Sequence, residues 1–358
     1  MRYPEFIKPG DTIGFIAPSF GCTIEPYLSC FEAAVGRFEK MGFKTRLGPN
    51  CFAAEGVGKS NTPAKCGSEV NAFLGSGPDI PDLRAVISCG GGETMCEDLP
   101  YIDFDDIRAA VPRWFMGYSD NTNLTFTLPV LCDTAAIYGP NAPSFGMERL
   151  HNSLVDALSF LRGEKLAFDS YPFWEKESLK TPETPFEAYN LTEPASIRTV
   201  SCDGQFVKNS SPVIDDRSVI FSGRMIGGCL DCLINLAGTP WDNAVGFCER
   251  YASDGIIWFL ESCDLTPMGI RRALWQLESN GWFRHVSGFI IGRPFMYDDR
   301  FGSEGPREAV LSILGGHGVP IILDADLGHL PPAMPFISGA CATVRAARGT
   351  MHVDYSLI

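Results

Sequence analysis

The chain has 358 residues, with 29 basic residues against 43 acidic ones and a formal net charge of −14. Apolar residues make up 45% and charged residues 20%, a globular balance that argues against disorder as the main state and suits two domains or one large one. The acidic surplus argues against a nucleic-acid binder and against an anionic membrane as partner, because both attract a surplus of Lys and Arg.

The first part of the chain alternates short apolar runs with helix-length segments. We predict a buried strand at 11–18, stopped by Pro18, and a helix at 26–41, where apolar residues recur at helical spacing. Two more apolar runs follow at 84–89 and 113–118. This alternation predicts βαβ units and therefore a parallel sheet, in a first domain at 1–162.

The segment 163–215 has a different composition, since prolines interrupt it, charges are frequent and aromatic residues are scattered. We expect a connector or mobile surface loop there rather than core.

A second α/β unit is expected at 216–358. Its apolar runs predict strands, and a segment that begins with a proline predicts a helix at 267–279. The runs lie at 218–221, 255–260, 287–292 and 320–323.

The N-terminal residues show no apolar core followed by a small-residue cleavage site, and no window holds about 18 uninterrupted apolar residues. We therefore expect neither a secretory signal nor a transmembrane helix. The 13 cysteines are odd in number and spread along the chain. They suit free thiols in a reducing compartment better than a disulfide framework, so we expect a cytoplasmic protein.

Two motifs resemble binding sites only in part. Residues 53–60 end in the Gly-Lys-Ser of a phosphate-binding loop, but Ala53 stands where that motif has a glycine. Cys229 and Cys232 form a lone CxxC pair, whereas a structural zinc site needs four ligands. We expect no nucleotide site at the first motif and core thiols on a helix at the second.

Ser119 follows the apolar run at 113–118 and precedes a helix-like segment. The run Gly-Tyr-Ser-Asp looks like a nucleophile elbow, which lifts the serine hydroxyl out of the sheet and aims the next backbone N–H at a developing oxyanion. The usual elbow has a second glycine two residues after the serine, where this chain has Asn121. A serine that caps a helix explains the pattern equally well.

Two further residues at predicted strand ends could complete a catalytic triad. A serine needs a base, usually a histidine that a carboxylate orients. His329 lies in a loop after the last apolar run, and Glu261 ends an earlier one. Asp324 and Asp326 are alternatives for the carboxylate. All of these residues could instead be caps and turn residues.

The chain also carries a series of short marks that are informative through their order and spacing. They are Lys8-Pro-Gly-Asp11, Ile16-Ala-Pro-Ser19, Gly91-Gly92, Leu99-Pro-Tyr-Ile-Asp103, Gly117-Tyr-Ser-Asp120, Tyr138-Gly-Pro140, Gly227-Gly228, Gly238-Thr239, Phe259-Leu-Glu261, Gly328-His329 and Pro335. Over nearly the whole length, this series resembles the LD-carboxypeptidase family of serine peptidases, which includes murein tetrapeptide carboxypeptidases and microcin-immunity peptidases.

The resemblance implies an α/β fold with two domains. The N-terminal domain would be a flavodoxin-like (glutamine-amidotransferase-like) parallel-sheet domain, and the C-terminal domain a swivelling β/β/α-type domain. The first would supply the nucleophile and the second the rest of the triad, so that the site forms only when both domains pack together. The resemblance also implies a homodimer without cofactor or metal.

The same resemblance implies a Ser–His–Glu triad at Ser119, His329 and Glu261. The oxyanion hole would be formed by the Asp120 amide and a glycine of the Gly91–Gly92 pair.

The chain departs from the family at two places. Gly90 makes the glycine run longer than the usual pair, which leaves open which amide serves the oxyanion. Cys229 stands where an asparagine is common. Neither change touches the triad.

The implied activity is that of a serine carboxypeptidase cleaving a peptide or amide bond near a free C-terminus. By family breadth we favour release of terminal D-alanine from the murein tetrapeptide, with a peptidyl- or aminoacyl-nucleotide conjugate as the second substrate type. An α/β-hydrolase acting on esters has the same Ser…acid…His order, and a non-catalytic binding module on the same fold is a further alternative.

Trp174 bears on the choice of substrate. In the family this stretch lies over the active site, and the immunity-type members carry a tryptophan there. Trp174 looks like that type and could stack on a nucleobase. The aromatic residues around it could equally pack the loop onto the domain.

Overall fold

The computed structural model describes residues 1–55, 58–77, 80, 82–201 and 214–358. Its chain divides into two compact units, each assembled from three segments. Unit 1 consists of Met1–Leu166, Glu177–Asn190 and Pro335–Ser338. Unit 2 consists of Ala167–Lys176, Leu191–Met334 and Gly339–Ile358.

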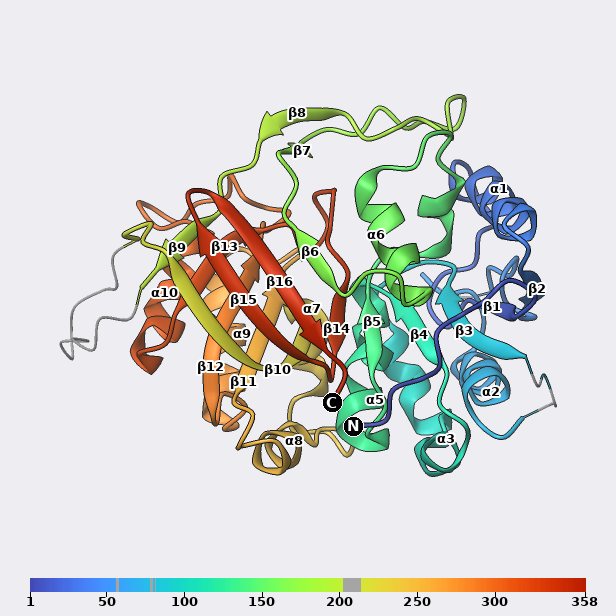
Figure 1. Ribbon diagram of the computed structural model, residues 1–358, viewed down its shortest axis with the longest axis horizontal. Coiled ribbons are helices and arrows are strands. Elements are labelled where there is room, and N and C mark those ends of the chain that lie inside the picture. Colours follow the sequence, from blue (N-terminus) through green and yellow to red (C-terminus); the bar gives the residue numbers. More distant parts are fainter. Residues whose placement is uncertain (56–57, 78–79, 81, 202–213) are drawn as a thin grey trace. The chain divides into compact units, whose positions relative to one another are not determined.

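Unit 1 is built on a six-stranded sheet in the order β14-β5-β4-β3-β1-β2 (Figure 1). The strands β1 to β5 run parallel, and β14 pairs antiparallel with β5. Their bounds are β1 (Thr12–Ile16), β2 (Lys44–Leu47), β3 (Leu83–Ser88), β4 (Trp114–Gly117), β5 (Ala136–Tyr138) and β14 (Phe336–Ser338). The predicted strands at 11–18, 84–89 and 113–118 are confirmed as β1, β3 and β4, whose apolar runs suit a parallel sheet buried on both faces.

The helices of unit 1 pack their apolar residues against this sheet. Phe31 and Phe38 lie two turns apart on the same face of the first helix, and both meet Phe15 of β1, at ring-centroid distances of 5.5 and 5.6 Å. The helices are α1 (Tyr27–Lys40), α2 (Pro63–Leu74), α3 (Phe104–Ala109), α4 (Thr122–Thr125), α5 (Thr127–Cys132) and α6 (Asn152–Leu161). Short 3₁₀ helices lie at Met95–Tyr101, Ser119–Asn121 and Ala142–Gly146.

Unit 2 is built on an eight-stranded mixed sheet in the order β6-β16-β15-β10-β11-β12-β13-β9. Strands β10 to β13 are parallel, and antiparallel strands flank them, among them the long β15–β16 hairpin of Figure 1. The bounds are β6 (Ala167–Asp169), β9 (Arg198–Val200), β10 (Val219–Cys229), β11 (Ile256–Glu261), β12 (Val286–Gly292), β13 (Ile321–Ala325), β15 (Cys341–Ala347) and β16 (Thr350–Ser356).

The helices of unit 2 follow the parallel strands, and α9 packs against both α7 and α10. The predicted helix at 267–279 is confirmed as α9, with Thr266 accepting the Gly269 N–H at its N-terminus. The helices are α7 (Leu230–Leu236), α8 (Ala244–Arg250), α9 (Pro267–Ser279), α10 (Pro306–Leu314) and a short 3₁₀ helix at Gly315–His317.

The segment 163–215 differs from the expected connector. Strands β6 and β9 join the edges of the eight-stranded sheet, and β7 (Phe173–Glu175) pairs with β8 (Leu191–Pro194) in a small sheet of its own. Residues 177–190 between them belong to unit 1. These strands have only three or four residues and their partners are distant in sequence, so they leave no local apolar pattern. Residues 202–213 lie outside the described part.

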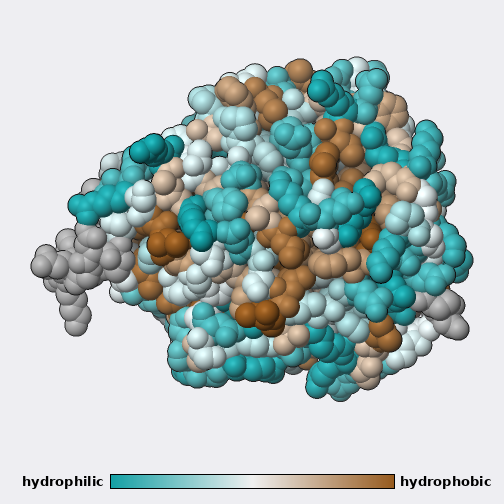
Figure 2. Space-filling view, in the orientation of Figure 1, coloured by the Kyte–Doolittle hydropathy of each residue, from teal (hydrophilic) through white to brown (hydrophobic). Residues whose placement is uncertain are grey.

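Within the described part of the chain, no helix combines the length and hydropathy needed to cross a lipid bilayer. Each cysteine described there is a free thiol, as the sequence predicted. On the face drawn in Figure 2, apolar residues form several separate patches among hydrophilic ones, an ordinary distribution for a protein surface.

An aromatic cluster forms part of the core of unit 2. Trp258 of β11 stacks on Trp282 at 5.7 Å between ring centroids and meets the edge of Phe283 at 5.5 Å. All three are buried. Because a large buried ring leaves a cavity when it is removed, this cluster makes a strong contribution to stability.

We expect Trp258→Ala to lower the free energy of unfolding by about 3–5 kcal/mol, because it opens a cavity in this cluster. Trp275→Ala is the matched control, since this tryptophan of α9 is 60% exposed. It should change stability by no more than about 0.5 kcal/mol. Urea denaturation measures both, and equal losses would contradict the placement of Trp258 in the core.

Candidate active site

Ser119 occupies a sharp turn between β4 and α4. Its backbone has φ of 65°, in the left-handed region that a residue with a side chain seldom adopts. Such strain costs about 1–3 kcal/mol and persists only where the surrounding structure enforces it. A strained serine between a parallel strand and a helix has the geometry of a nucleophile elbow.

Hydrogen bonds involving three neighbouring side chains hold this turn in place. The Ser119 N–H donates to Tyr138 Oη at 3.1 Å, and Thr122 Oγ1 donates to the Ser119 carbonyl at 2.7 Å. Asn121 Nδ2 donates to the Gly90 carbonyl at 2.9 Å. A Cβ on Gly117 would lie 2.9 Å from Asn121 Cβ, so the glycine two residues before the serine makes room for the asparagine that replaces the usual second glycine.

The glycine run lies directly against Ser119. A Cβ added to Gly91 would lie 2.9 Å from Ser119 Cβ and 3.0 Å from its Oγ. A Cβ on Gly92 would lie 2.3 Å from Ser19 Oγ. Only residues without a side chain fit here, and the close approach brings the backbone of this run near the serine hydroxyl, where an oxyanion hole would be needed.

Asp120 anchors the peptide that follows the serine. Its buried side chain accepts hydrogen bonds at Oδ2 from Ser19 Oγ at 2.5 Å and from the Met95 N–H at 2.9 Å. Asn123 Nδ2 donates to the Asp120 carbonyl at 2.8 Å. Burial raises the pKa of the Asp120 carboxyl, while the bonds from Ser19 and Met95 oppose that rise. The Asp120 amide is therefore held by contacts to both its side chain and its carbonyl.

The lysine of the phosphate-loop-like run lies in a cluster of carboxyl groups. Lys59 Nζ is 2.7 Å from Glu97 Oε2 and 3.6 Å from Asp98 Oδ1. The ammonium is thus paired with the Glu97 carboxylate. The two residues at 56–57 of this run lie outside the described part. Burial raises the pKa of the Asp98 carboxyl to about 8, which Lys59 opposes and Asp120 reinforces.

In unit 2, the ends of β11 and β13 bring Glu261 and His329 together. Glu261 Oε2 lies 2.9 Å from His329 Nδ1, and Glu261 is only 1% exposed. Gly328 has φ of 106°, and a Cβ there would lie 2.8 Å from Glu261 Oε2, so a glycine must precede the histidine. With Nδ1 beside the carboxylate, Nε2 is the imidazole nitrogen that a catalytic triad would use for proton transfer.

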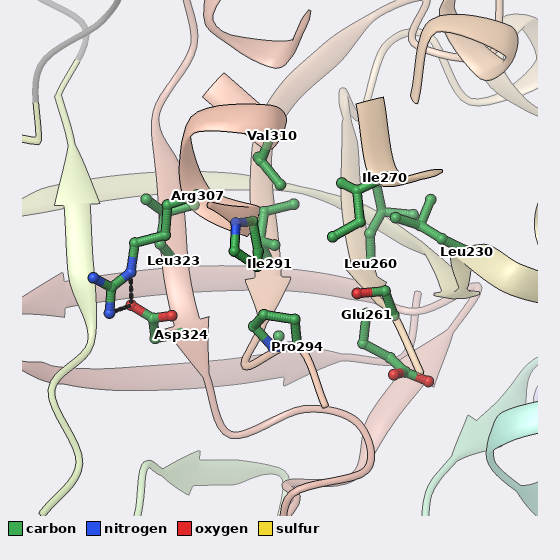
Figure 3. Close-up of a pocket in the computed structure, with 13 residues that line it drawn as sticks. Leu230, Leu260, Glu261, Ile270, Ile291, Pro294, Arg307, Val310, Leu323 and Asp324 are labelled. Carbon is green, nitrogen blue, oxygen red and sulfur yellow. Dashed lines mark hydrogen bonds and ion pairs between the residues drawn. The ribbon is translucent and has the colours of Figure 1, made fainter. Parts of the chain in front are cut away.

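The two competing carboxylates have other partners. Asp324 Oδ2 accepts from Arg307 Nε at 2.8 Å, and Figure 3 shows the guanidinium directed at that carboxylate. Asp326 Oδ1 accepts from Arg293 Nη2 at 2.8 Å. Of the three carboxylates that the sequence left as candidates, Glu261 is the one that lies beside His329.

A small apolar cavity of about 20 Å³ lies beside Glu261. Figure 3 shows the Glu261 carboxylate directed away from Leu260 and Ile270, which line the cavity with other apolar side chains. The residue therefore lies beside apolar side chains while its carboxylate points away from them.

Cys229 and Cys232 are buried at the N-terminal end of α7. Cys229 lies opposite Glu261 in the register of β10 and β11, and its Sγ is 3.3 Å from Asp231 Oδ2. Among the described residues, no group of three or more His, Cys, Asp or Glu side chains is arranged to hold a metal ion.

Trp174 lies in unit 2 with 9% of its surface exposed. The Arg293 guanidinium lies 4.7 Å from its ring centroid, and Tyr297 meets it at 5.4 Å, nearly perpendicular. The three residues help to line a polar cavity of about 300 Å³. Sequence reasoning assigned no role to Arg293, nor to Tyr138 in unit 1, because a long-range contact leaves no local pattern.

The chain matches the models of both domains of one protein family. The LD-carboxypeptidase N-terminal domain matches residues 13–139, and the LD-carboxypeptidase C-terminal domain matches residues 222–344. The chain belongs to the LD-carboxypeptidase family. The expected family and two-domain α/β architecture are thereby confirmed.

Some similar proteins are named as microcin self-immunity proteins and others as carboxypeptidases. The microcin C7 self-immunity protein MccF of Escherichia coli is 25% identical over 331 residues, covering 91% of this chain and 88% of that protein. The murein tetrapeptide carboxypeptidase of Pseudomonas aeruginosa is 25% identical over 287 residues, covering 78% and 75%. The crystal structure of an MccF-like protein from Bacillus anthracis has the same fold, with a TM-score of 0.77, 22% identity and coverage of 99% and 100%.

The raised pKa of Asp98 predicts a pH-dependent stability. From the ordinary value of 3.8 up to about 8, folded Asp98 holds a proton that the unfolded chain has lost. The free energy of unfolding should therefore fall as pH rises through this window, by at most about 1.4 kcal/mol per pH unit from this group.

We expect Asp98→Asn to flatten that dependence, because the amide does not titrate. Denaturant titrations between pH 5 and pH 9 measure it, with Asp105→Asn as a control on an exposed carboxyl that should keep the wild-type slope. Parallel curves for wild type and Asp98→Asn would show that Asp98 is already ionised in the folded protein.

Proposed function

We propose that this protein is a serine carboxypeptidase in which Ser119 is the nucleophile, His329 the general base and Glu261 the residue that orients the imidazole. The observation that carries the proposal is the 2.9 Å contact between Glu261 and His329 Nδ1 at the ends of two strands of one sheet. The strained elbow at Ser119 and the membership of the LD-carboxypeptidase family support it.

The proposed reaction follows from these roles. Ser119 Oγ attacks the carbonyl of the scissile bond while His329 Nε2 takes the hydroxyl proton and then gives it to the leaving amine. Glu261 stabilises the imidazolium and remains ionised. The developing oxyanion accepts hydrogen bonds from the Asp120 amide and from Gly91 or Gly92. Water then releases the acyl group, with His329 again acting as base.

Both units are needed for this mechanism, since Ser119 belongs to unit 1 and His329 to unit 2. The reaction requires neither a metal nor a cofactor, because the imidazole moves the proton and backbone amides stabilise the charge. We further propose that the protein acts as a homodimer in the cytoplasm. A monomer-sized species in light scattering would contradict the dimer.

We propose the murein tetrapeptide as substrate, with its terminal D-alanine as the released product and peptidoglycan recycling as the setting. The resemblance to the murein tetrapeptide carboxypeptidase supports this choice. A second candidate is a peptidyl- or aminoacyl-nucleotide conjugate, which the relation to MccF over 91% of the chain supports. Mass spectrometry of products from a panel of muropeptides and such conjugates tests both, and cleavage of simple esters alone would contradict both.

We expect Ser119→Ala and His329→Ala each to lower turnover by a factor on the order of 10⁴–10⁶, because the triad acts as a unit. Circular dichroism and thermal melting should show that both variants fold. Labelling with a fluorophosphonate should be lost in Ser119→Ala. A folded Ser119→Ala protein with full activity would contradict the nucleophile assignment, and substrate binding without turnover by the wild type would favour a binding module.

We expect Gly91→Ala to lower kcat by about 10²-fold, since its methyl group would meet Ser119 and move it from its reactive position. Gly36→Ala is the matched control, because nothing lies within 4 Å of a Cβ there. Steady-state kinetics on the substrate identified above measure both variants. Wild-type kcat in Gly91→Ala would contradict the close approach of the glycine run to a catalytic serine.

A further inference from the structure

The segment that carries His329 is a closed loop. The Met334 N–H donates to the Asp326 carbonyl at 2.8 Å, which joins the two ends of residues 326–334, here named the His329 loop. The loop begins directly after β13 and holds the imidazole against Glu261. Because a loop of this kind has few backbone ladder bonds, its position depends on the side chains and strands around it.

Arg293 contacts this loop on both sides of the histidine. Its Nη2 donates to Asp326 Oδ1 at 2.8 Å, and its Nη1 lies 3.4 Å from the Leu330 carbonyl. Its own N–H donates to the Ala325 carbonyl at 3.1 Å. Arg293 and Asp326 are 4% and 0% exposed, so this is a buried ion pair whose loss would leave a charge without its partner.

The segment of residues 171–175 packs against the His329 loop. The Tyr171 N–H donates to Asp326 Oδ2 at 2.7 Å, and the Glu175 N–H donates to the Pro331 carbonyl at 2.7 Å. Between these two contacts, the Trp174 ring lies over the Arg293 guanidinium at 4.7 Å. A ring in this position attracts the cation and shields it from water, which strengthens its bonds to the loop.

We propose that Trp174 and Arg293 are positioning residues for His329. Trp174 covers Arg293, Arg293 holds the His329 loop through Asp326 and Leu330, and the loop thereby fixes the imidazole against Glu261. This inference rests on the proposed role of His329 as the general base. In this proposal Trp174 acts by contacting the Arg293 guanidinium and does not bind the substrate itself.

The two roles of Trp174 differ in what they change. A positioning residue affects proton transfer, which every substrate requires, so its loss lowers kcat by the same factor for all of them. A residue that stacks on a nucleobase contributes binding energy to one class of substrate, so its loss raises KM for the conjugate alone.

Kinetics on the full chain test the proposal with Trp174→Ala, Trp174→Phe and the exposed control Trp275→Ala. In Trp174→Ala we expect kcat to fall about tenfold on every accepted substrate, with KM within about twofold of wild type. Phenylalanine keeps a ring over Arg293 and should restore most of the activity, while Trp275→Ala should match wild type. A raised KM for the conjugate with unchanged kcat would overturn the proposal.

A second measurement does not depend on activity. In ¹⁵N-histidine-labelled protein, the Nδ1 proton of His329, assigned with His329→Gln, reports its hydrogen bond to Glu261. We expect this resonance to broaden or shift in Trp174→Ala and to persist in Trp174→Phe and Trp275→Ala. An unchanged resonance in folded Trp174→Ala would overturn the positioning role. If wild type cleaves no substrate while the resonance still responds, the proposed function fails and the positioning role stands.

Discussion

A buried carboxylate next to an imidazole determines what unit 2 can do chemically. Glu261 has lost nearly all contact with water, so its charge needs a partner, and His329 Nδ1 at 2.9 Å provides one. The same contact favours the tautomer in which Nδ1 carries the proton and Nε2 is the basic nitrogen. Strand order makes the pair possible, because β12 alone separates β11 from β13 and both strands end at the same edge of the sheet.

Close backbone approach is the corresponding constraint in unit 1. The elbow at Ser119 can be strained because Tyr138, Thr122 and Asn121 hold its backbone groups. Glycines provide the space that the turn needs. Gly117, two residues before the serine, leaves room for Asn121, and Gly91 leaves room for the Ser119 side chain. In unit 2, the glycine before His329 admits the Glu261 carboxylate in the same way.

Each unit has buried charged groups near its candidate site residues. In unit 1, Asp98 lies near the Lys59 ammonium, and the neighbouring Asp120 carboxyl contributes to the raised pKa of Asp98. In unit 2, Arg293 pairs with Asp326 of the His329 loop and lies against the Trp174 ring. Such pairs are costly to bury unless all of their polar groups are satisfied, and they then hold one arrangement in preference to others.

The sequence by itself determined the central strands of both sheets, because long apolar runs such as 255–260 can only be buried. It also located Ser119, Glu261 and His329 at strand ends, and its series of short marks indicated the family. Only the tertiary structure decided which carboxylate meets His329, since Asp324, Asp326 and Glu261 all follow apolar runs and differ only in what the neighbouring strands bring to them. The short strands within 163–215 and the cation over Trp174 were likewise beyond sequence reasoning, because both depend on partners distant in the chain. Local patterns report burial and turns, whereas contacts between distant residues exist only after the chain has folded.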